Sequence, residues 1–215
     1  MFFRGSKGEI IKDFKMFGPR VYKSSPFMEQ KGFSLVITGP MGSGKTTELF
    51  RQLERIEIAG GTVMLIKPVR DDRDTGVRTH GGFEREAIAL NSPEEIFDYL
   101  EPEITTIGIE EAQFFDDSIC GVVRVLVAHG KRVILSGLDL DAMGRPFGPM
   151  PFLLTQAEYV MKLQAVCMSC GADASRTKRK VESKEQVMVG GMEIYEPVCT
   201  ACHESWLRGE REGEL

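Results

Sequence analysis

Hydrophobic and polar positions follow a regular pattern along the chain from residue 33 onward. Short apolar runs, typical of strands buried on both faces of a sheet, lie at 33–38, 62–67, 105–110 and 132–138. Segments with apolar residues at helical spacing predict helices at 46–59, 92–100 and 118–129. Because strands and helices alternate, we expect an α/β fold with a parallel sheet and right-handed crossovers.

The segments outside this pattern predict how the chain is organised. Residues 1–31 mix aromatic and charged side chains with glycine and proline, which favours a poorly ordered N-terminal extension. We expect a core domain at 32–160, a small second domain at 161–206 and a tail at 207–215. The segment 70–83 is polar and contains glycine, so it predicts a loop.

Composition narrows the classes of protein. The chain has 215 residues and a formal net charge of −5, which argues against a general nucleic-acid binder because phosphate backbones attract an excess of Lys and Arg. No apolar run approaches the roughly 20 residues that a membrane-spanning helix needs. The first residues also lack the apolar core of a signal peptide. We therefore expect a cytoplasmic protein without nucleic-acid or membrane partners.

The turn after the first predicted strand carries the strongest motif. Residues 39–46 (GPMGSGKT) match G-x-x-x-x-G-K-[ST] in full, between a strand and a helix, so a chance glycine-rich turn is the minor alternative. Such a P-loop wraps backbone N–H groups around phosphates, while its Lys reaches the β- and γ-phosphates and its Thr binds Mg²⁺. The candidate ATP-binding residues are Gly39, Pro40, Met41, Gly42, Ser43, Gly44, Lys45 and Thr46.

Two adjacent acids end the third predicted strand. Neighbouring side chains on an extended backbone point to opposite sides, so one carboxylate can face a metal and the other a substrate hydroxyl. We predict Glu110 as the magnesium-side acid, together with Thr46, and Glu111 as the general base. The alternative is that one of the two acids only caps the next helix or faces solvent.

Four of the five cysteines form two pairs in a C-x₂-C…C-x₂-C arrangement. Four thiolates suit tetrahedral Zn²⁺, and a closed set of four ligands is structural rather than catalytic. Disulfides or free thiols are the alternative, and His203 is a competing ligand. Cys120 lies on an apolar helix face and is predicted to be a small core residue. The predicted zinc ligands are Cys167, Cys170, Cys199 and Cys202.

A long loop, 171–198, projects between the two cysteine pairs. It contains a basic run at 176–180, which is either functional or a solvated face. It also contains Gly190 and Gly191, which permit close approach of the backbone to a ligand. Because a single metal would hold both ends of this loop, we expect it to act as a lid.

These motifs together resemble the type II thymidine kinases, the family that includes the cytosolic human and most bacterial thymidine kinases. The resemblance covers about residues 33–206 and is highly specific. The matching segments, in the family's order, are GPMGSGKTTEL (39–49), Lys67-Pro68 with Asp71 and Arg73, THGG (79–82), EEAQFF (110–115), LDLDAMGRPFG (138–148), VMKLQAVCMSCGADASRTKR (160–179) and VGGMEIYEPVCTACH (189–203).

The resemblance implies a RecA-like P-loop core, a zinc-held lasso over the nucleoside, and transfer of phosphate from ATP to thymidine and deoxyuridine. It further implies a homotetramer inhibited by thymidine triphosphate. The catalytic acid falls on Glu111 and the metal-side acid on Glu110, with Gln113 at the ATP site. The nucleoside-binding residues fall on Met41, Phe114, Leu138, Thr177, Met188, Val189, Gly190 and Tyr195.

The chain departs from the family pattern at three places. Glu110 replaces the usual Asp, Ala142 the usual Phe, and Met143 an Arg found in many bacterial members, while Arg145 lies two residues on. Ala142 leaves either a wider pocket or a gap that a neighbour such as Met143 fills. Two other classes stay open: a P-loop ATPase that spends ATP on conformational work, and a zinc-module nucleic-acid binder regulated by ATP.

Overall fold

A computed structural model describes residues 32–69, 76–79, 81–181 and 190–209. The chain divides into two units, Met1–Gln30 and Lys31–Leu215. The first unit, which contains the expected N-terminal extension, lies outside the described residues, as does most of the expected tail. The second unit contains all of the described residues, and its expected division at residue 160 stays a prediction.

The second unit is built on a six-stranded sheet with the order β5-β2-β6-β7-β1-β8. Every neighbouring pair in this sheet is parallel, so the predicted α/β fold is confirmed. The strands are β1 (Phe33–Thr38), β2 (Thr62–Pro68), β5 (Ile88–Leu90), β6 (Ile104–Ile109), β7 (Arg132–Gly137) and β8 (Tyr159–Lys162). Four of them were predicted from apolar runs, whereas β5 and β8 are short strands at the two edges.

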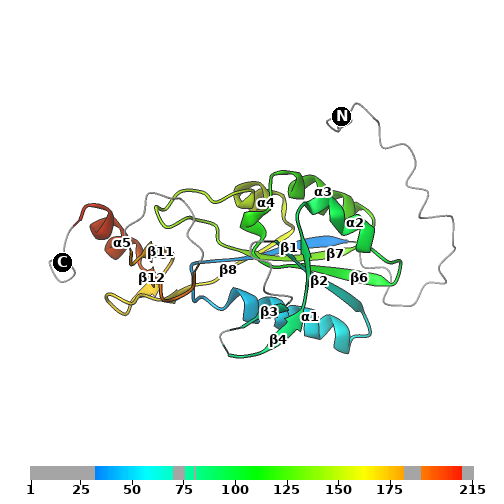
Figure 1. Cartoon of the computed structure of the whole chain (residues 1–215), viewed down its shortest axis with the longest axis horizontal. Coiled ribbons are helices and arrows are strands. Elements are labelled where there is room, and N and C mark those ends of the chain that lie inside the picture. Colours follow the sequence, from blue (N-terminus) through cyan, green and yellow to red (C-terminus); the bar gives the residue numbers. More distant parts are fainter. Residues whose placement is uncertain (1–31, 70–75, 80, 182–189, 210–215) are drawn as a thin grey trace. The chain divides into compact units, whose positions relative to one another are not determined.

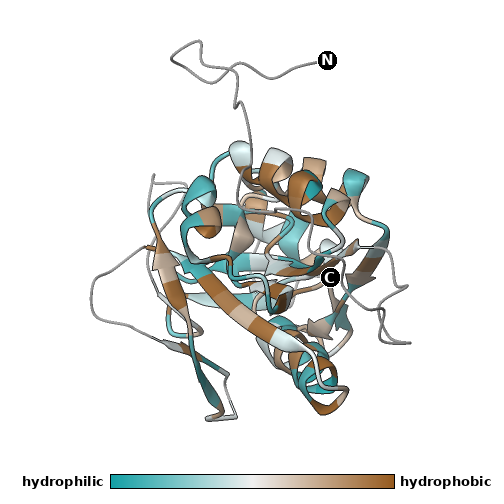
Figure 2. Cartoon of the chain, turned by 90° about the vertical axis from the view of Figure 1, so that its right-hand side faces the viewer, coloured by the Kyte–Doolittle hydropathy of each residue, from teal (hydrophilic) through white to brown (hydrophobic). Residues whose placement is uncertain are grey.

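The two faces of the sheet are covered by different helices. Helix α1 (Lys45–Ile58) and a small hairpin lie on one face (Figure 1). Helices α2 (Ile96–Tyr99), α3 (Ser118–Ala128) and α4 (Met150–Gln156) lie on the other. On β1, Leu35 and Ile37 point toward α1, while Val36 between them packs in the cluster that includes α3 (Ser118–Ala128). This alternation explains why the strands read as unbroken apolar runs. Figure 2 shows hydrophobic residues concentrated along the strands and on parts of the flanking helices.

Several short elements differ from the predictions. The expected helix at 92–100 is reduced to a 3₁₀ turn, Pro93–Glu95, and a single turn of α2, Ile96–Tyr99. Its buried residues are Pro93 and Ile96, and the backbone is already extended at Leu100. The expected loop at 70–83 contains β3 (Gly76–Arg78), which pairs with β4 (Glu84–Glu86) as a hairpin. Helix α4 (Met150–Gln156) was not predicted.

The C-terminal part of the unit forms a small module of paired strands and one helix. Its elements are β9 (Ala165–Val166), β10 (Asp173–Ala174), β11 (Arg176–Arg179), β12 (Tyr195–Val198) and α5 (Thr200–Leu207). Strands β9 and β10, and β11 and β12, form antiparallel pairs. Lys178 and Arg179 in the basic run are 8% and 5% exposed, and Lys178 pairs with Glu196 at 2.9 Å, so these two residues do not form a solvated face.

No helix within the described residues is both long enough and apolar enough to cross a membrane. Cys120 packs partly buried against the cluster that contains α3, as its position on the apolar face of that helix predicted.

Candidate active site

The glycine loop, residues 39–46, connects β1 to α1 at the carboxyl edge of the sheet. Gly39, Gly42 and Gly44 have φ of 143°, 73° and 83°, values that glycine adopts without the steric cost other residues incur. A Cβ on Gly39 would lie 2.3 Å from the carbonyl oxygen of Leu163. The path of this loop therefore depends on glycine at these positions.

Lys45 points back over the glycine loop. Its Nζ donates a hydrogen bond to the carbonyl oxygen of Pro40 at 2.7 Å. Burial lowers the pKa of the Lys45 ammonium, and three nearby carboxylates oppose that shift. These carboxylates belong to Glu111, Glu110 and Asp139. The loop thus presents one buried cation to a group of acids.

Glu110 sits at the end of β6 and is 6% exposed. The hydroxyl of Thr46 donates to one of its carboxylate oxygens at 2.5 Å, and the hydroxyl of Ser136 donates to the other. Burial, together with the neighbouring Glu111, raises the pKa of Glu110 to about 7. A buried carboxylate beside a threonine hydroxyl suits a hard cation such as Mg²⁺, which would replace the missing solvation of its charge.

Glu111 turns away from the strand direction. Its φ is 53°, and among the described residues it is the one non-glycine residue with a positive φ. Strain of this kind is concentrated at functional sites. The amide nitrogen of Gln113 donates to the Glu111 carboxylate, and the Gln113 amide oxygen accepts the N–H of Leu138 at 3.1 Å. Gln113 is 2% exposed and lies behind Glu111 rather than among the residues that line the cavity.

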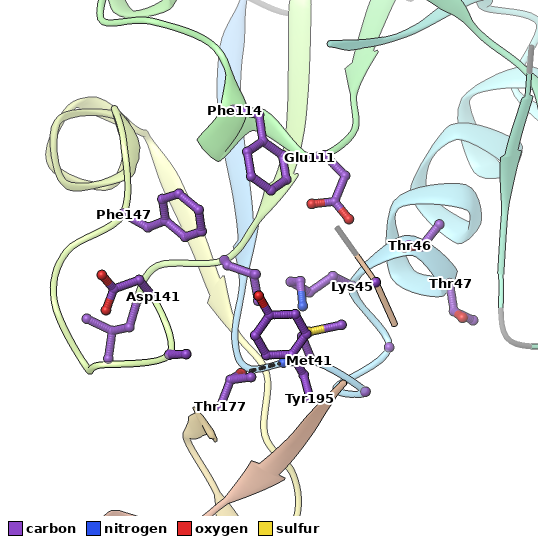
Figure 3. A pocket seen from close by; sticks show the side chains of 16 residues that line it. Met41, Lys45, Thr46, Thr47, Glu111, Phe114, Asp141, Phe147, Thr177 and Tyr195 are labelled. Atoms are coloured by element: carbon purple, nitrogen blue, oxygen red, sulfur yellow. Dashed lines mark hydrogen bonds between the residues drawn. The ribbon is translucent and has the colours of Figure 1, made fainter. Parts of the chain in front are cut away.

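One cavity is lined by many of the predicted site residues, although Gly39, Pro40, Ser43, Glu110 and Gln113 are not among its lining residues. Glu111 and Lys45 point into it, with Phe114 and Phe147 beside them and Tyr195 and Met41 across the space (Figure 3). Its lining residues are Met41, Gly42, Gly44, Lys45, Thr46, Thr47, Glu111, Phe114, Leu138, Leu140, Asp141, Ala142, Phe147, Thr177, Gly190 and Tyr195. The predicted nucleoside-binding residues Met188 and Val189 lie outside the described residues.

The loop after β7, residues 138–148, forms one wall of the cavity. The rings of Phe114 and Phe147 meet edge to face, with centroids 5.3 Å apart. Asp141 accepts hydrogen bonds from the backbone N–H groups of Met143 and Arg145, both at 2.9 Å, and it pairs with the Arg145 guanidinium. These bonds give the loop a defined shape.

Sequence reasoning placed only Leu138 of this wall at the site and singled out Ala142 as a departure. It missed Leu140, Asp141 and Phe147, although all three lie in the quoted segment 138–148. It also missed the ion pair between Lys162 Nζ and Asp139 Oδ2, 2.7 Å apart, beside the glycine loop. None of these residue types is specific to a binding site. Their place within the segments that resemble the family was therefore the only feature of the sequence that could have predicted their roles.

The small module contacts the glycine loop directly. The backbone N–H of Met41 donates to the hydroxyl of Thr177 on β11 at 3.0 Å, as Figure 3 shows. A Cβ on Gly42 would lie 3.5 Å from the side chain of Met192 and 3.8 Å from Pro197. The strand pair β11–β12 therefore closes the cavity on the side opposite Phe114.

The four predicted cysteine ligands gather at the base of the module, and they could hold a zinc ion. Their sulfur atoms all lie within 4.8 Å of one another, and the sulfurs of Cys170 and Cys199 are 3.7 Å apart. A tetrahedral site with Zn–S bonds of about 2.3 Å has sulfur–sulfur edges of about 3.8 Å, so this cluster fits the ion. His203 is not part of the cluster, because its ring points to the 138–148 loop.

The sequence matches a known protein family over most of its length. A match to the thymidine kinase family extends over residues 32–203. The matched region contains the glycine loop, both acids, the loop after β7 and all four clustered cysteines. The chain belongs to the thymidine kinase family.

Proposed function

We propose that the protein transfers the γ-phosphate of ATP to the 5′-hydroxyl of thymidine, and also of deoxyuridine, with Glu111 as the general base. Membership of the thymidine kinase family implies phosphorylation of thymidine in nucleoside salvage. The observation that carries the finer proposal is the single cavity in which the glycine loop, Glu111 and the small module meet. Phosphoryl transfer needs mainly such positioning, together with neutralisation of charge.

The triphosphate would bind at the glycine loop. Lys45 lies at the N-terminus of α1, where the helix dipole and free N–H groups favour an anion. On binding, its ammonium would exchange the Pro40 carbonyl for β- and γ-phosphate oxygens. Thr46 and Glu110 would hold Mg²⁺, which supplies neutralisation of phosphate charge in the transition state.

Glu111 would take the proton of the acceptor. The 5′-oxygen forms a bond to the γ-phosphorus, the bond from that phosphorus to the β–γ bridging oxygen breaks, and ADP leaves. The hydroxyl proton passes to the Glu111 carboxylate. Gln113 keeps this carboxylate aimed into the cavity, and Leu138 in turn holds Gln113. In this proposal Gln113 orients the base instead of contacting ATP.

The nucleoside would occupy the side of the cavity away from Lys45. Phe114, Phe147 and Tyr195 offer aromatic surfaces for a base and a sugar. Leu138 and Ala142 complete an apolar wall, on which a pyrimidine with or without a methyl group would rest. This arrangement supports acceptance of both thymidine and deoxyuridine.

The zinc ion would be structural in this proposal. The cysteine cluster anchors β11 and β12, which carry Thr177 and Tyr195 to the cavity as a lid. From the family resemblance we extend the proposal to a cytoplasmic homotetramer that thymidine triphosphate inhibits.

A panel of acceptors tests this function. Purified protein with Mg²⁺ and labelled ATP should phosphorylate thymidine and deoxyuridine, while deoxyguanosine should stay unmodified. ATP hydrolysis without nucleoside, unaffected by added thymidine, would instead identify an ATPase that performs conformational work. A gel shift of single-stranded DNA at low salt tests the nucleic-acid alternative. If the protein leaves the mobility of the DNA unchanged, this alternative is excluded.

The same panel run on Ala142→Phe tests the pocket wall. Ala142 is 6% exposed and lines the cavity, so an added ring narrows the space for the base. We expect the variant to accept fewer bases than the wild type. An identical range in both proteins would mean that neighbours such as Met143 repack and that this position does not set specificity.

A further inference from the structure

His203 connects the small module to the wall of the cavity. Its side chain is 1% exposed, and its Nε2 lies 2.9 Å from the carbonyl oxygen of Ala142. Since a carbonyl can only accept, Nε2 carries the proton and donates. His203 follows Cys202 directly, and its backbone N–H donates to the carbonyl of Cys199 at 3.0 Å. His203 is therefore fixed next to the cysteine cluster, and it holds Ala142, which lines the cavity.

The ring of His203 is also fixed in orientation. Gly144 lies against one part of it, where an added Cβ would be 3.2 Å from the His203 Cε1. Gly144 has a φ of 75° and no Cβ, so its backbone can lie close to the imidazole. The Trp206 ring packs nearby, with centroids 5.4 Å apart. This close packing aims Nε2 at the Ala142 carbonyl.

The hydrogen bonds within the 138–148 loop do not do what the bond between His203 and Ala142 does. Asp141 orders the turn through the N–H groups of Met143 and Arg145, and Leu140 bridges to Pro146. These bonds shape the loop itself, and its first two residues are held by Gln113, which accepts the N–H of Leu138, and by Lys162, which pairs with Asp139. Neither contact reaches the segment around Ala142. The His203 hydrogen bond does so, because it joins positions 61 residues apart in a buried setting.

We propose that His203 is a positioning residue for the nucleoside, which holds the Ala142 wall in place and links the cysteine cluster to nucleoside affinity. The inference rests on the proposed function, since it requires the nucleoside to bind against the 138–148 loop. His203 touches neither the glycine loop nor the reacting groups described above. Its loss should therefore weaken nucleoside binding without impairing ATP binding or the chemical step.

Two substitutions separate the hydrogen bond from simple packing. His203→Phe keeps a ring but removes the donor, and the buried Ala142 carbonyl then loses its partner. His203→Gln keeps an amide N–H at similar reach. We expect His203→Phe to raise the KM and the dissociation constant for thymidine by about tenfold. The kcat and the KM for ATP should stay within about twofold of wild type, and His203→Gln should recover most of the affinity.

The measurements are steady-state kinetics in both substrates, calorimetric binding of thymidine without ATP, and zinc content of each protein. His129→Gln, at an exposed histidine on the end of α3, serves as the matched control and should behave as wild type. The proposal would be overturned if His203→Phe and His203→Gln lowered thymidine affinity equally. It would also be overturned if the KM for ATP rose as much as the KM for thymidine. If His203→Phe loses zinc, His203→Asn, whose amide is too short to reach the carbonyl, replaces it in the comparison.

This experiment also distinguishes the inference from the function on which it rests. A wild-type protein that neither binds nor phosphorylates thymidine would overturn the proposed function. An active wild type whose His203 variants keep normal thymidine affinity would overturn only the role of His203.

Discussion

Glu110 and Glu111 are adjacent in the chain and both lie near Lys45, but their immediate surroundings differ. Glu110 is buried, receives hydrogen bonds from two hydroxyls and has its pKa raised to about 7. Glu111 lines the cavity on a strained turn and receives an amide hydrogen bond from Gln113. Two like acids in different settings are suited to different tasks, one toward a metal and one toward a substrate proton.

Glu111→Gln tests the role of the base. The substitution keeps the shape and an oxygen for Gln113 but removes the proton acceptor, so kcat should fall by about 10²–10⁴-fold. Binding of ATP and thymidine, measured by calorimetry, should persist. Glu54→Gln, at an exposed position on α1, is the matched control and should keep full activity. A near-normal kcat in Glu111→Gln would show that Glu111 is not the base.

The raised pKa of Glu110 predicts how stability depends on pH. Its folded-state pKa of about 7 lies above the ordinary value of 4.5, so the folded protein binds the proton more tightly than the unfolded chain. The associated stabilisation is fully present below about pH 4.5 and is lost as pH rises through about 7. Glu110→Gln lacks this effect. In buffer without Mg²⁺, the Tm of wild type relative to that of Glu110→Gln should fall between pH 5 and pH 8.

A constant difference in Tm across that range would contradict the prediction. It would mean that the Glu110 carboxyl keeps an ordinary pKa despite its burial. Zinc content should be measured at each pH, so that a change at the cysteine cluster is not mistaken for titration of Glu110.

At the scale of elements, the glycine loop depends on close approach between backbone segments. Gly39 lies against the segment that follows β8, and its φ is also unfavourable for other residues. Gly121 in α3 is the opposite case, because a Cβ there would meet nothing within 4 Å. The two glycines therefore provide a comparison in which the substitution is the same and the surroundings differ.

Gly39→Ala should impair folding or abolish ATP binding, since the new methyl group would displace the backbone of Leu163. Gly121→Ala should raise the free energy of unfolding by about 0.5–1 kcal/mol, because alanine favours a helix interior. Chemical denaturation and ATP titration of both variants check this. Normal ATP affinity and stability in Gly39→Ala would show that the loop can relax around the methyl group.

At the scale of the whole described unit, hydrogen bonds join the small module to the walls of the cavity on both the glycine-loop side and the 138–148 side. Thr177 receives the N–H of Met41 in the glycine loop, and His203 donates to Ala142 in the loop after β7. Both residues lie on elements that the cysteine cluster anchors. In the proposed function, the cluster would therefore support a wall of the cavity at a distance from the reacting groups.

Substitution of one of the four clustered cysteines should weaken nucleoside binding more than ATP binding. In Cys202→Ser the module loses its anchor, whereas the glycine loop stays held between β1 and α1. We expect a lower Tm, loss of zinc and a large rise in the KM for thymidine. Cys120→Ser, which changes a cysteine outside the cluster, should retain zinc and thymidine affinity. Equal thymidine affinity in zinc-free and zinc-loaded protein would contradict this role of the cluster.

The sequence alone determined the features that depend on residues close together in the chain. Apolar runs indicated four of the six strands, and the spacing of glycines, Lys45 and Thr46 indicated the glycine loop. The two cysteine pairs predicted a cluster, because each pair brings two thiols together through a short local turn. Motif resemblance added residues that line the cavity, including Thr177 and Tyr195.

Only the tertiary structure decided which residues meet across the chain. Gln113 lies behind Glu111, Asp139 pairs with Lys162, and His203 bonds to Ala142 instead of joining the cysteines. Each of these outcomes depends on how strands pair and on where a side chain points once the core is packed. The local sequence pattern does not predict such contacts. The burial of a side chain and the direction in which it points are set only when distant segments pack together.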